Sequence, residues 1–139
     1  LLREYPGVTY VQNRTYELLL QSKAALVTSG TATLETALLG IPEVVCYKGS
    51  PISYQIAKRV IKVKYISLVN LIMDREIVKE LIQDAFNPEL LEAGLKTILD
   101  DAQQIAKMKT EYALLKKLLQ QGGDASATAA AHINRFLSA

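Results

Sequence analysis

A Ser-Gly-Thr turn is the stretch of this sequence best suited to bind an anion. Ser29-Gly30-Thr31 follows the apolar run Ala24–Val27 and precedes a helical pattern over 32–39. Free N–H groups and the dipole at a helix N-terminus favour a phosphate, the glycine lets the backbone approach closely, and the two hydroxyls add donors. An ordinary strand-to-helix turn with hydroxyl caps explains the same residues about equally well. The stretch is neither a Walker loop nor the Rossmann glycine motif.

Glu35 lies in the first turn of the same predicted helix. The helix dipole favours a carboxylate at this position, which is a purely structural explanation. A capping box does not account for it, because Ala32 stands three residues earlier where that motif needs Ser or Thr. The carboxylate is therefore free to accept hydrogen bonds from neighbouring hydroxyls, such as those of a ribose.

The stretch from residue 44 to residue 73 contains no acidic side chain. It contains five cations, Lys48, Lys58, Arg59, Lys62 and Lys64, interleaved with Tyr47, Tyr54 and Tyr65. A solvated helix face is the simpler explanation of such a run. The pattern also predicts contact with the phosphates of a substrate or with an anionic bilayer.

Several other polar residues leave more than one interpretation open. Asn70 stands in the apolar stretch Leu68–Ile72 and is either a turn-former or a site residue. Glu76, Glu80 and Gln83 share one face of a predicted helix, where solvated surface is the simpler explanation.

Composition excludes several classes of function. Half of the residues are hydrophobic and 22% are charged, which is typical of a globular chain, and a net charge of +2 argues against a chain-wide polyanion binder. Seven Tyr, two Phe and no Trp argue against nucleic-acid binding by base stacking. Cys46 is predicted to be a core residue, and His132 to lie at the surface or at an interface. Because the chain has one Cys and one His, it can form neither an internal disulfide nor a zinc site of ordinary composition.

The chain also lacks the marks of a membrane or secreted protein. No apolar run approaches the roughly 20 residues of a membrane span, and the opening Leu-Leu-Arg-Glu-Tyr-Pro is not a signal peptide. Because position 1 is not Met, we expect a fragment of a longer, cytoplasmic protein.

Three predicted strands alternate with helices in the first part of the chain. The strands fall at 8–11, 24–27 and 43–47, separated by a helix that Asn13 caps and by the helix over 32–39. These spacings predict right-handed βαβ units in a parallel sheet. A helix over 53–62, a short strand over 65–68 and a helix capped by Asp74 are predicted to follow. The apolar face of that last helix is Ile77, Val78, Leu81 and Ile82.

The remaining part is predicted to be helical. Asn87-Pro88 opens a helix to about Leu99, and Asp124 opens the last helix. The helix between them carries an apolar seam at 3-4 spacing: Ile105, Met108, Tyr112, Leu115 and Leu119. The fold class is therefore a single α/β domain, with a Rossmann-like parallel sheet and flanking helices at about 8–83 and a helical tail at about 87–139.

Together these segments resemble the lipid-A-disaccharide synthase family. The resemblance runs from about Val8 to Gln83 and is carried by Ser29–Glu35, Pro42, Val44-Val45, Tyr47-Lys48, Ile56–Arg59, Tyr65–Leu68, Asn70–Ile72 and Glu80–Gln83. The family usually has Asp in place of Lys23 and Pro in place of Val69. Its Gly-Ser-Arg loop and its acceptor-binding half with acidic catalytic residues have no counterpart in this chain.

The resemblance implies the later part of the donor-binding half of a B-type, two-domain glycosyltransferase. That enzyme transfers a diacylated glucosamine from UDP to lipid X and forms the lipid A disaccharide, without a metal or other cofactor. This piece alone is expected to be inactive. The implied partners are the UDP-linked donor, lipid X through the missing half, and the anionic inner membrane, on which the protein is peripheral and cytoplasmic.

The resemblance also assigns roles to individual residues. The Ser29-Gly30-Thr31 turn meets the diphosphate, Glu35 binds the ribose, and Val11, Gln12 and Asn13 lie against uracil. Tyr47 and Lys48 join the substrate site, and Asn70 matches a functionally sensitive asparagine and is assigned to catalysis. The basic residues Lys58, Arg59 and Lys62 are assigned to the membrane or the acylated substrate.

Two alternatives stay open, together with the question of a homo-oligomer. One is another enzyme of this fold that uses UDP-N-acetylglucosamine, either a peptidoglycan glycosyltransferase or a 2-epimerase. The other is a non-catalytic module that binds a partner through the Ile105–Leu119 seam.

Overall fold

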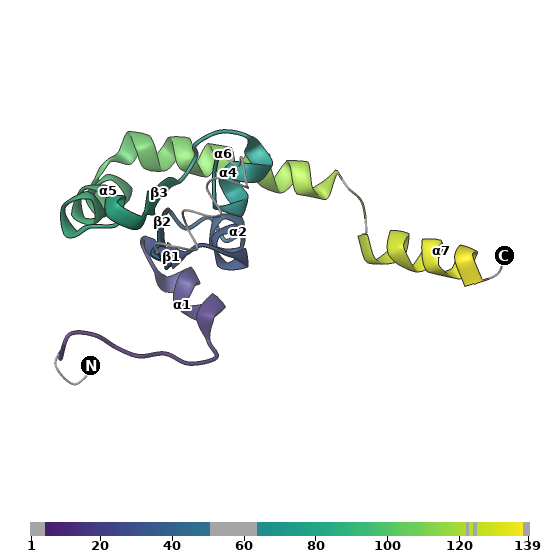
Figure 1. The fold of residues 1–139 in the computed structure, drawn as a ribbon, viewed down its shortest axis with the longest axis horizontal. Helices are drawn as coiled ribbons and strands as arrows, with labels where there is room; N and C mark the ends of the chain where they lie inside the picture. Colours follow the sequence, from purple (N-terminus) through teal and green to yellow (C-terminus); the bar gives the residue numbers. More distant parts are fainter. Residues whose placement is uncertain (1–4, 51–63, 122, 124, 138–139) are drawn as a thin grey trace.

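A three-stranded parallel sheet lies at the centre of the computed structural model, which describes residues 5–50, 64–121, 123 and 125–137 (Figure 1). The strands are β1 (Ala25–Thr28), β2 (Glu43–Tyr47) and β3 (Lys79–Ile82), in the spatial order β1-β2-β3. Thr28, Cys46 and Leu81 lie side by side in register. The predicted α/β class with a parallel sheet and helical C-terminal part is confirmed.

β2 is the central strand and the most deeply buried one. Val44 and Val45 have no exposed surface, because β2 pairs on both edges and helices cover it. β1 was predicted at the right place, but it is not buried on both faces. Val27 is buried, whereas Leu26 is 47% exposed.

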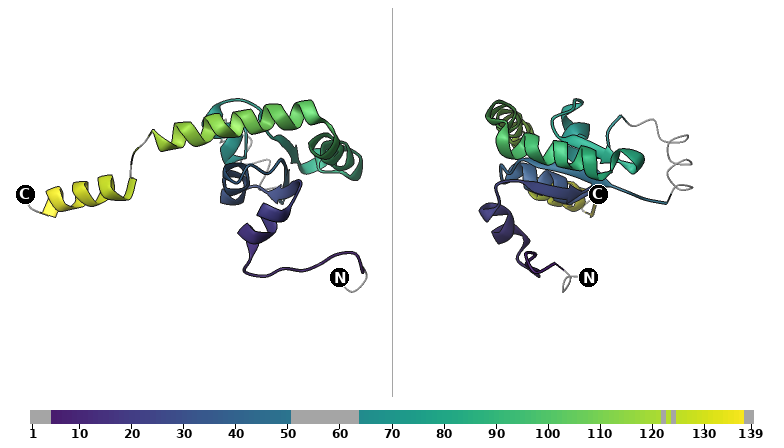
Figure 2. Two further views of the ribbon diagram at one scale, coloured as in Figure 1. Left: turned by 180° about the vertical axis from the view of Figure 1, so that it is seen from behind. Right: turned by 90° about the vertical axis from the view of Figure 1, so that its left-hand side faces the viewer.

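The helices around this sheet form one connected set. Their bounds are α1 Thr15–Gln21, α2 Thr31–Leu38, α4 Leu68–Met73, α5 Pro88–Asp100, α6 Ala102–Gln120 and α7 Ala125–Leu137, with a 3-10 turn η2 at Gln83–Ala85. α2, α4 and α6 contact one another, and α5 packs on α6 as well as on β2 and β3. Figure 2 shows α6 along one side of the sheet and α1 on the opposite side. A Cβ at Gly94 of α5 would lie 3.2 Å from a methyl of Val44, so the glycine permits this close helix–sheet contact.

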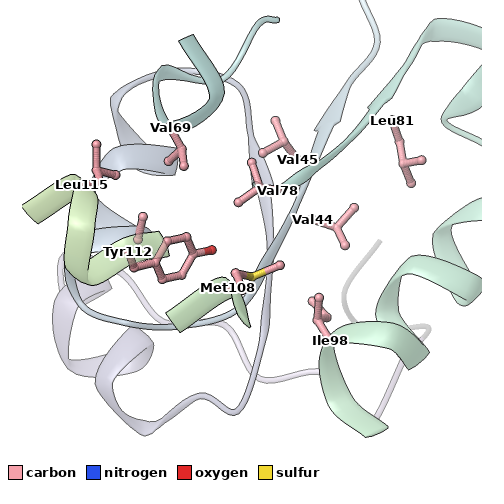
Figure 3. Packing of buried hydrophobic residues seen from close by; sticks show 10 residues of the cluster. Val44, Val45, Val69, Val78, Leu81, Ile98, Met108, Tyr112 and Leu115 are labelled. Atoms are coloured by element: carbon pink, nitrogen blue, oxygen red, sulfur yellow. The ribbon is translucent and has the colours of Figure 1, made fainter. Parts of the chain in front are cut away.

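The predicted seam of α6 is confirmed as the link between helix and sheet. Met108, Tyr112 and Leu115 are buried, whereas Leu119 at the end of the helix is exposed. Figure 3 shows these side chains packed against valines of β2 and of the segment before β3. The middle of the seam is therefore internal, so these three residues do not form the surface that the interaction-module alternative requires.

The segment before β1 differs from the prediction. Residues 8–11 are irregular and exposed, and Asn13 does not cap α1. The residue before α1 is Arg14, which makes no side-chain cap, and Asn13 has a left-handed φ of 58°. A strand needs a neighbour for its N–H and C=O groups, and β1 pairs only with β2 among the described strands.

The segment between β2 and α5 was also predicted wrongly. Residues 65–68 are not a strand, because the Ser67 hydroxyl accepts from the Asn70 N–H and starts α4. Asp74 ends α4 with φ 48° instead of opening a helix, and the following apolar residues lead into β3. The helix predicted over 53–62 lies outside the described residues.

The C-terminal helices agree better with prediction. Asn87 caps α5 through its Oδ1 atom, which accepts from the Leu90 N–H at 2.9 Å, and Pro88 is the first helical residue. α7 projects from the body of the chain in Figure 1, and its Ile133, Phe136 and Leu137 are exposed. No helix in the described part of the chain is long and apolar enough to cross a bilayer.

A carboxyl group is buried at the start of β2. Glu43 has no exposed surface, and neither of its side-chain oxygens has a hydrogen-bond partner. Burial raises the pKa of Glu43 to about 9. The adjacent Tyr112 hydroxyl is likewise buried and unpaired, and burial followed by the charge of Glu43 raises its pKa. Glu43 is therefore a neutral acid in the folded chain at pH 7.

We predict that Glu43 makes stability fall as pH rises. The unfolded carboxyl releases its proton near its ordinary pKa of 4.5, whereas the folded one keeps it to about 9. Between these values only the folded state holds the proton, so the free energy of unfolding falls by at most about 1.4 kcal/mol per pH unit. Glu43→Gln removes this titration. The free energy of unfolding of the variant, relative to that of the parent, should therefore rise by about 2–4 kcal/mol from pH 5 to pH 8, as measured by urea unfolding. A difference that stays constant with pH would show that Glu43 titrates normally.

Candidate functional site

The ends of the three parallel strands form one edge, and this is where open α/β sheets bind ligands. The register brings Thr28, Cys46 and Leu81 to the same level. Two residues further on, each chain segment leaves the sheet, at Gly30, Lys48 and Gln83. The Ser29-Gly30-Thr31 turn and the Tyr47–Lys48 segment, both predicted as site residues, therefore lie on the same edge.

The Gly30 turn opens α2 with a backbone conformation that requires glycine. Its φ of 145° and ψ of −163° fall in a region that is essentially closed to other residues. No side chain caps the N-terminus of α2; the Thr33 hydroxyl instead donates to the Gly30 carbonyl at 2.8 Å. A Cβ at Gly30 would meet nothing within 4 Å, so the space in front of the turn is open. These features suit an anion at the start of α2.

Ser29 contributes less to this turn than the sequence predicted. Its hydroxyl donates to the Ile66 carbonyl at 3.0 Å. A serine hydroxyl has one proton, so this O–H is not available to a phosphate while that bond exists. The bond instead ties the turn to the segment before α4. Thr31 is exposed, and its hydroxyl remains a candidate donor.

Glu35 lies one helical turn after Thr31, beyond the first turn of α2 in which it was predicted, and is half-buried. Tyr16 of α1 is its neighbour, since a hydrogen bond to Glu35, followed by the charge of that carboxylate, raises the pKa of Tyr16. A carboxylate has about four acceptor positions, so one phenol leaves room for ribose hydroxyls. The carboxylate of Glu35 thus faces Tyr16 of α1 and keeps further acceptor positions.

The segment after β2 folds back on itself. A Cβ at Gly49 would lie 2.9 Å from the Tyr47 hydroxyl oxygen and 3.2 Å from carbons of its ring, so this ring covers the glycine. The Gly49 N–H donates to Oε1 of Gln83 at 3.2 Å. Tyr47 and Lys48 themselves are exposed.

The carboxylate of Glu80 holds the segment that supports the Gly30 turn. It accepts from the backbone N–H groups of Ile66 at 2.9 Å and Ser67 at 3.0 Å, and from the Ser67 hydroxyl at 2.8 Å. The Ile66 carbonyl receives the Ser29 hydroxyl. A continuous path therefore runs from β3 through Ile66 to the turn. The sequence placed Glu80 on a solvated helix face and missed this role.

Asn70 lies at the centre of the same network and is fully buried. Its Nδ2 donates to the Val78 carbonyl and to Glu80, both at 2.8 Å. Its Oδ1 accepts from the N–H groups of Ile77 at 2.8 Å and Val78 at 3.0 Å. All four hydrogen-bonding positions of the amide are therefore occupied within the protein. The one signal in the sequence was an amide inside an apolar run.

Other predicted site residues are not gathered at this edge. Val11, Gln12 and Asn13 are exposed in the segment before α1, which Figure 1 shows leading away from the sheet. The basic residues Lys58, Arg59 and Lys62 lie outside the described residues. In the part of the chain that the structure describes, no three His, Cys, Asp or Glu side chains gather to hold a metal ion.

A parallel α/β sheet with a glycine turn and a helix start at its carboxyl edge defines a class of proteins that bind anionic ligands there. This chain belongs to the lipid-A-disaccharide synthetase family, whose model matches residues 5–134. The family that the sequence resembles is thereby confirmed.

Individual relatives agree with this assignment. A lipid-A-disaccharide synthase of Geobacter sulfurreducens is 39% identical over 116 residues, which are 84% of this chain and 30% of the relative. Those of Syntrophus aciditrophicus and Pseudomonas aeruginosa are 41% and 42% identical over 89% and 92% of the chain. Each match covers 32% of the relative, so the chain spans about a third of the length of these proteins.

We predict that Asn70→Ala destabilises the chain by about 2–4 kcal/mol. The change leaves buried backbone groups of Ile77 and Val78 and the Glu80 carboxylate short of partners, and each unpaired buried group costs about 1–3 kcal/mol. Gln103→Ala on the exposed face of α6 is the control and should change stability by less than about 0.5 kcal/mol. Equal urea midpoints for the two variants would show that the Asn70 network does not stabilise the fold.

Proposed function

We propose that this chain is the donor-binding part of a glycosyltransferase that makes the lipid A disaccharide. Its ligand would be a UDP-linked, diacylated glucosamine, and lipid X would accept the sugar. Family membership and the names of the relatives support the reaction. The observation that carries the assignment to this edge is the Gly30 turn, which opens α2 without a side-chain cap and with free space in front of it.

The geometry supports a direction for the bound nucleotide. The diphosphate would accept from N–H groups at the start of α2, with the Thr31 hydroxyl beside them. Glu35 would bind the ribose on the side of α1, so the sugar end would extend toward the loops after β2 and β3. Tyr47 and Lys48 lie in that direction, and the ammonium group would favour the negative charge of the diphosphate. Contact of uracil with Val11–Asn13 would require the segment before α1 to approach Gly30.

Asn70 fits a positioning role better than direct participation in the reaction. Its amide has no free donor or acceptor while the network is intact. It would act through Glu80 and Ile66, which support Ser29 and the turn. A catalytic base would then come from the part of the enzyme that the relatives have and this chain lacks, and the 139 residues alone would be inactive.

Membrane contact forms the second part of the proposal. The acylated substrates have to be reached at a bilayer surface, and the sequence concentrates Lys58, Arg59 and Lys62 within five residues. Cations near an anionic leaflet gain about 1 kcal/mol each. The protein would then be peripheral, on the cytoplasmic side of the inner membrane.

We predict that Glu35→Gln weakens UDP binding about tenfold or more. A hydrogen bond from a hydroxyl to a carboxylate is worth about 1.5–3 kcal/mol, and the amide loses the charge. Calorimetry with UDP on the full chain that carries these residues gives the dissociation constant. Glu89→Gln, an exposed acid in the first turn of α5, is the matched control and should leave binding unchanged. If Glu35→Gln binds UDP as the parent does, Glu35 does not contact the nucleotide.

We also predict that Lys58, Arg59 and Lys62 bind anionic membranes. Changing all three to Gln removes about 3 kcal/mol of attraction and should reduce binding to anionic vesicles roughly a hundredfold at low salt. Changing Lys107, Lys109 and Lys116 of α6 to Gln alters the net charge equally and should have a smaller effect. Co-sedimentation is the measurement, and equal losses for both triple variants would mean that net charge alone governs binding.

A further inference from the structure

Gln83 is the first residue after β3 and stands at the same level of the sheet as Gly30 and Lys48. Its φ of 53° places a residue with a long side chain in the left-handed region. Only a few per cent of non-glycine residues adopt this conformation, and such strain gathers at ligand sites. The backbone here turns the side chain of Gln83 toward the loop after β2, as its bond to Gly49 shows.

The orientation of the Gln83 amide is fixed by that bond. The Gly49 N–H needs an acceptor, so the oxygen Oε1 must face it, at 3.2 Å. The nitrogen Nε2 then points elsewhere, and it is buried with no hydrogen-bond partner. Buried donors without a partner are rare in folded proteins, because such a group loses its hydrogen bonds to water and forms none within the protein.

The fold does not need this donor. A Glu side chain could accept from Gly49 equally well, and a Met side chain would fill the same volume without an unpaired N–H. What the N–H adds is a neutral donor at the ligand edge. Because β2 lies between β1 and β3, Gln83 starts two strand spacings, about 9.6 Å, from the level of Gly30, and its side chain reaches back toward the loop after β2. A diphosphate whose first phosphate lies at the Gly30 turn extends its second phosphate in this direction, because Glu35 holds the ribose on the other side.

We propose that Nε2 of Gln83 donates a hydrogen bond to the second phosphate of the bound nucleotide, the phosphate that carries the sugar. This inference rests on the proposed function of the edge. The bond from Gly49 is at the long end of the hydrogen-bond range, so a small shift of the Tyr47–Gly49 loop gives the phosphate access to the nitrogen. Gln83 thus both holds the loop and binds the nucleotide.

The test compares UDP with UMP, which lacks the second phosphate. Calorimetry is done on the full chain that carries these residues, for the parent, Gln83→Glu and Gln83→Met. The Glu variant keeps an acceptor for Gly49 but puts a negative charge against the phosphate, and the Met variant loses both bonds. We expect the dissociation constant for UDP to rise at least tenfold with Glu and about three- to tenfold with Met, while that for UMP changes less than twofold in both.

Other outcomes would overturn the inference in distinguishable ways. If Gln83→Glu binds UDP as tightly as the parent while Gln83→Met binds it more weakly, Gln83 only positions Gly49 and does not bind the phosphate. Equal losses for UMP and UDP would mean a general disturbance of the edge. If Gln83→Glu does not fold, as thermal melting would show, the UDP-to-UMP comparison for Gln83→Met decides alone. A parent that binds neither nucleotide would instead refute the proposed function, and this inference with it.

Discussion

The carboxylate of Glu80 and the amide of Asn70 together hold a segment that has little regular structure of its own. Between residues 64 and 78 only the short helix α4 is regular, yet Ser67, Val69, Asn70 and Val78 are fully buried. Their backbone groups cannot turn to water, and buried polar groups without partners are costly. Glu80 accepts from Ile66 and Ser67, and Asn70 pairs with Ile77 and Val78. Two side chains thereby replace the neighbouring strand that this segment does not have.

This constraint reaches the candidate site through one bond. Ile66 is held by Glu80 at its N–H and by the Ser29 hydroxyl at its carbonyl, so the turn before α2 is fixed to β3 as well as to β1. A second link joins the neighbouring loops, since Gly49 donates to Gln83. Two residues with positive φ, Gly30 and Gln83, lie at this edge, whereas the opposite end of the sheet carries the uncharged Glu43 in the core. Two hydrogen bonds between distant segments thus meet where a ligand would bind.

The sequence predicted the elements whose signals are local. β2 follows from an apolar run after Pro42, α5 from an Asn-Pro cap, and α6 from the 3-4 spacing of its buried residues. Each of these patterns depends on a few neighbouring residues.

The elements that were predicted wrongly depend on partners distant in the chain. β3 looked helical because Ile77, Val78, Leu81 and Ile82 suit a helix face, but its pairing with β2 decides its conformation. Asn70 could not be interpreted, since its bonds go to residues up to ten positions away, and Glu80 looked like a surface residue for the same reason. At the candidate site, the start of α2 after the Ser29-Gly30-Thr31 turn was identifiable from sequence. The hydrogen bond from the Ser29 hydroxyl to the Ile66 carbonyl and the unpaired nitrogen of Gln83 were not identifiable, because both arise from tertiary contacts.

The central claim is that the edge between Gly30 and Gln83 binds the uridine diphosphate part of a nucleotide sugar. The most direct test is an NMR titration of the isotope-labelled chain with UDP, which follows every backbone amide and the side-chain amides together. The account predicts that the largest shifts occur at Gly30, Thr31 and Gly49 and at the side-chain amide of Gln83, with little change in α7. Shifts confined to α5, α6 or α7, or no shift at millimolar UDP, would contradict it.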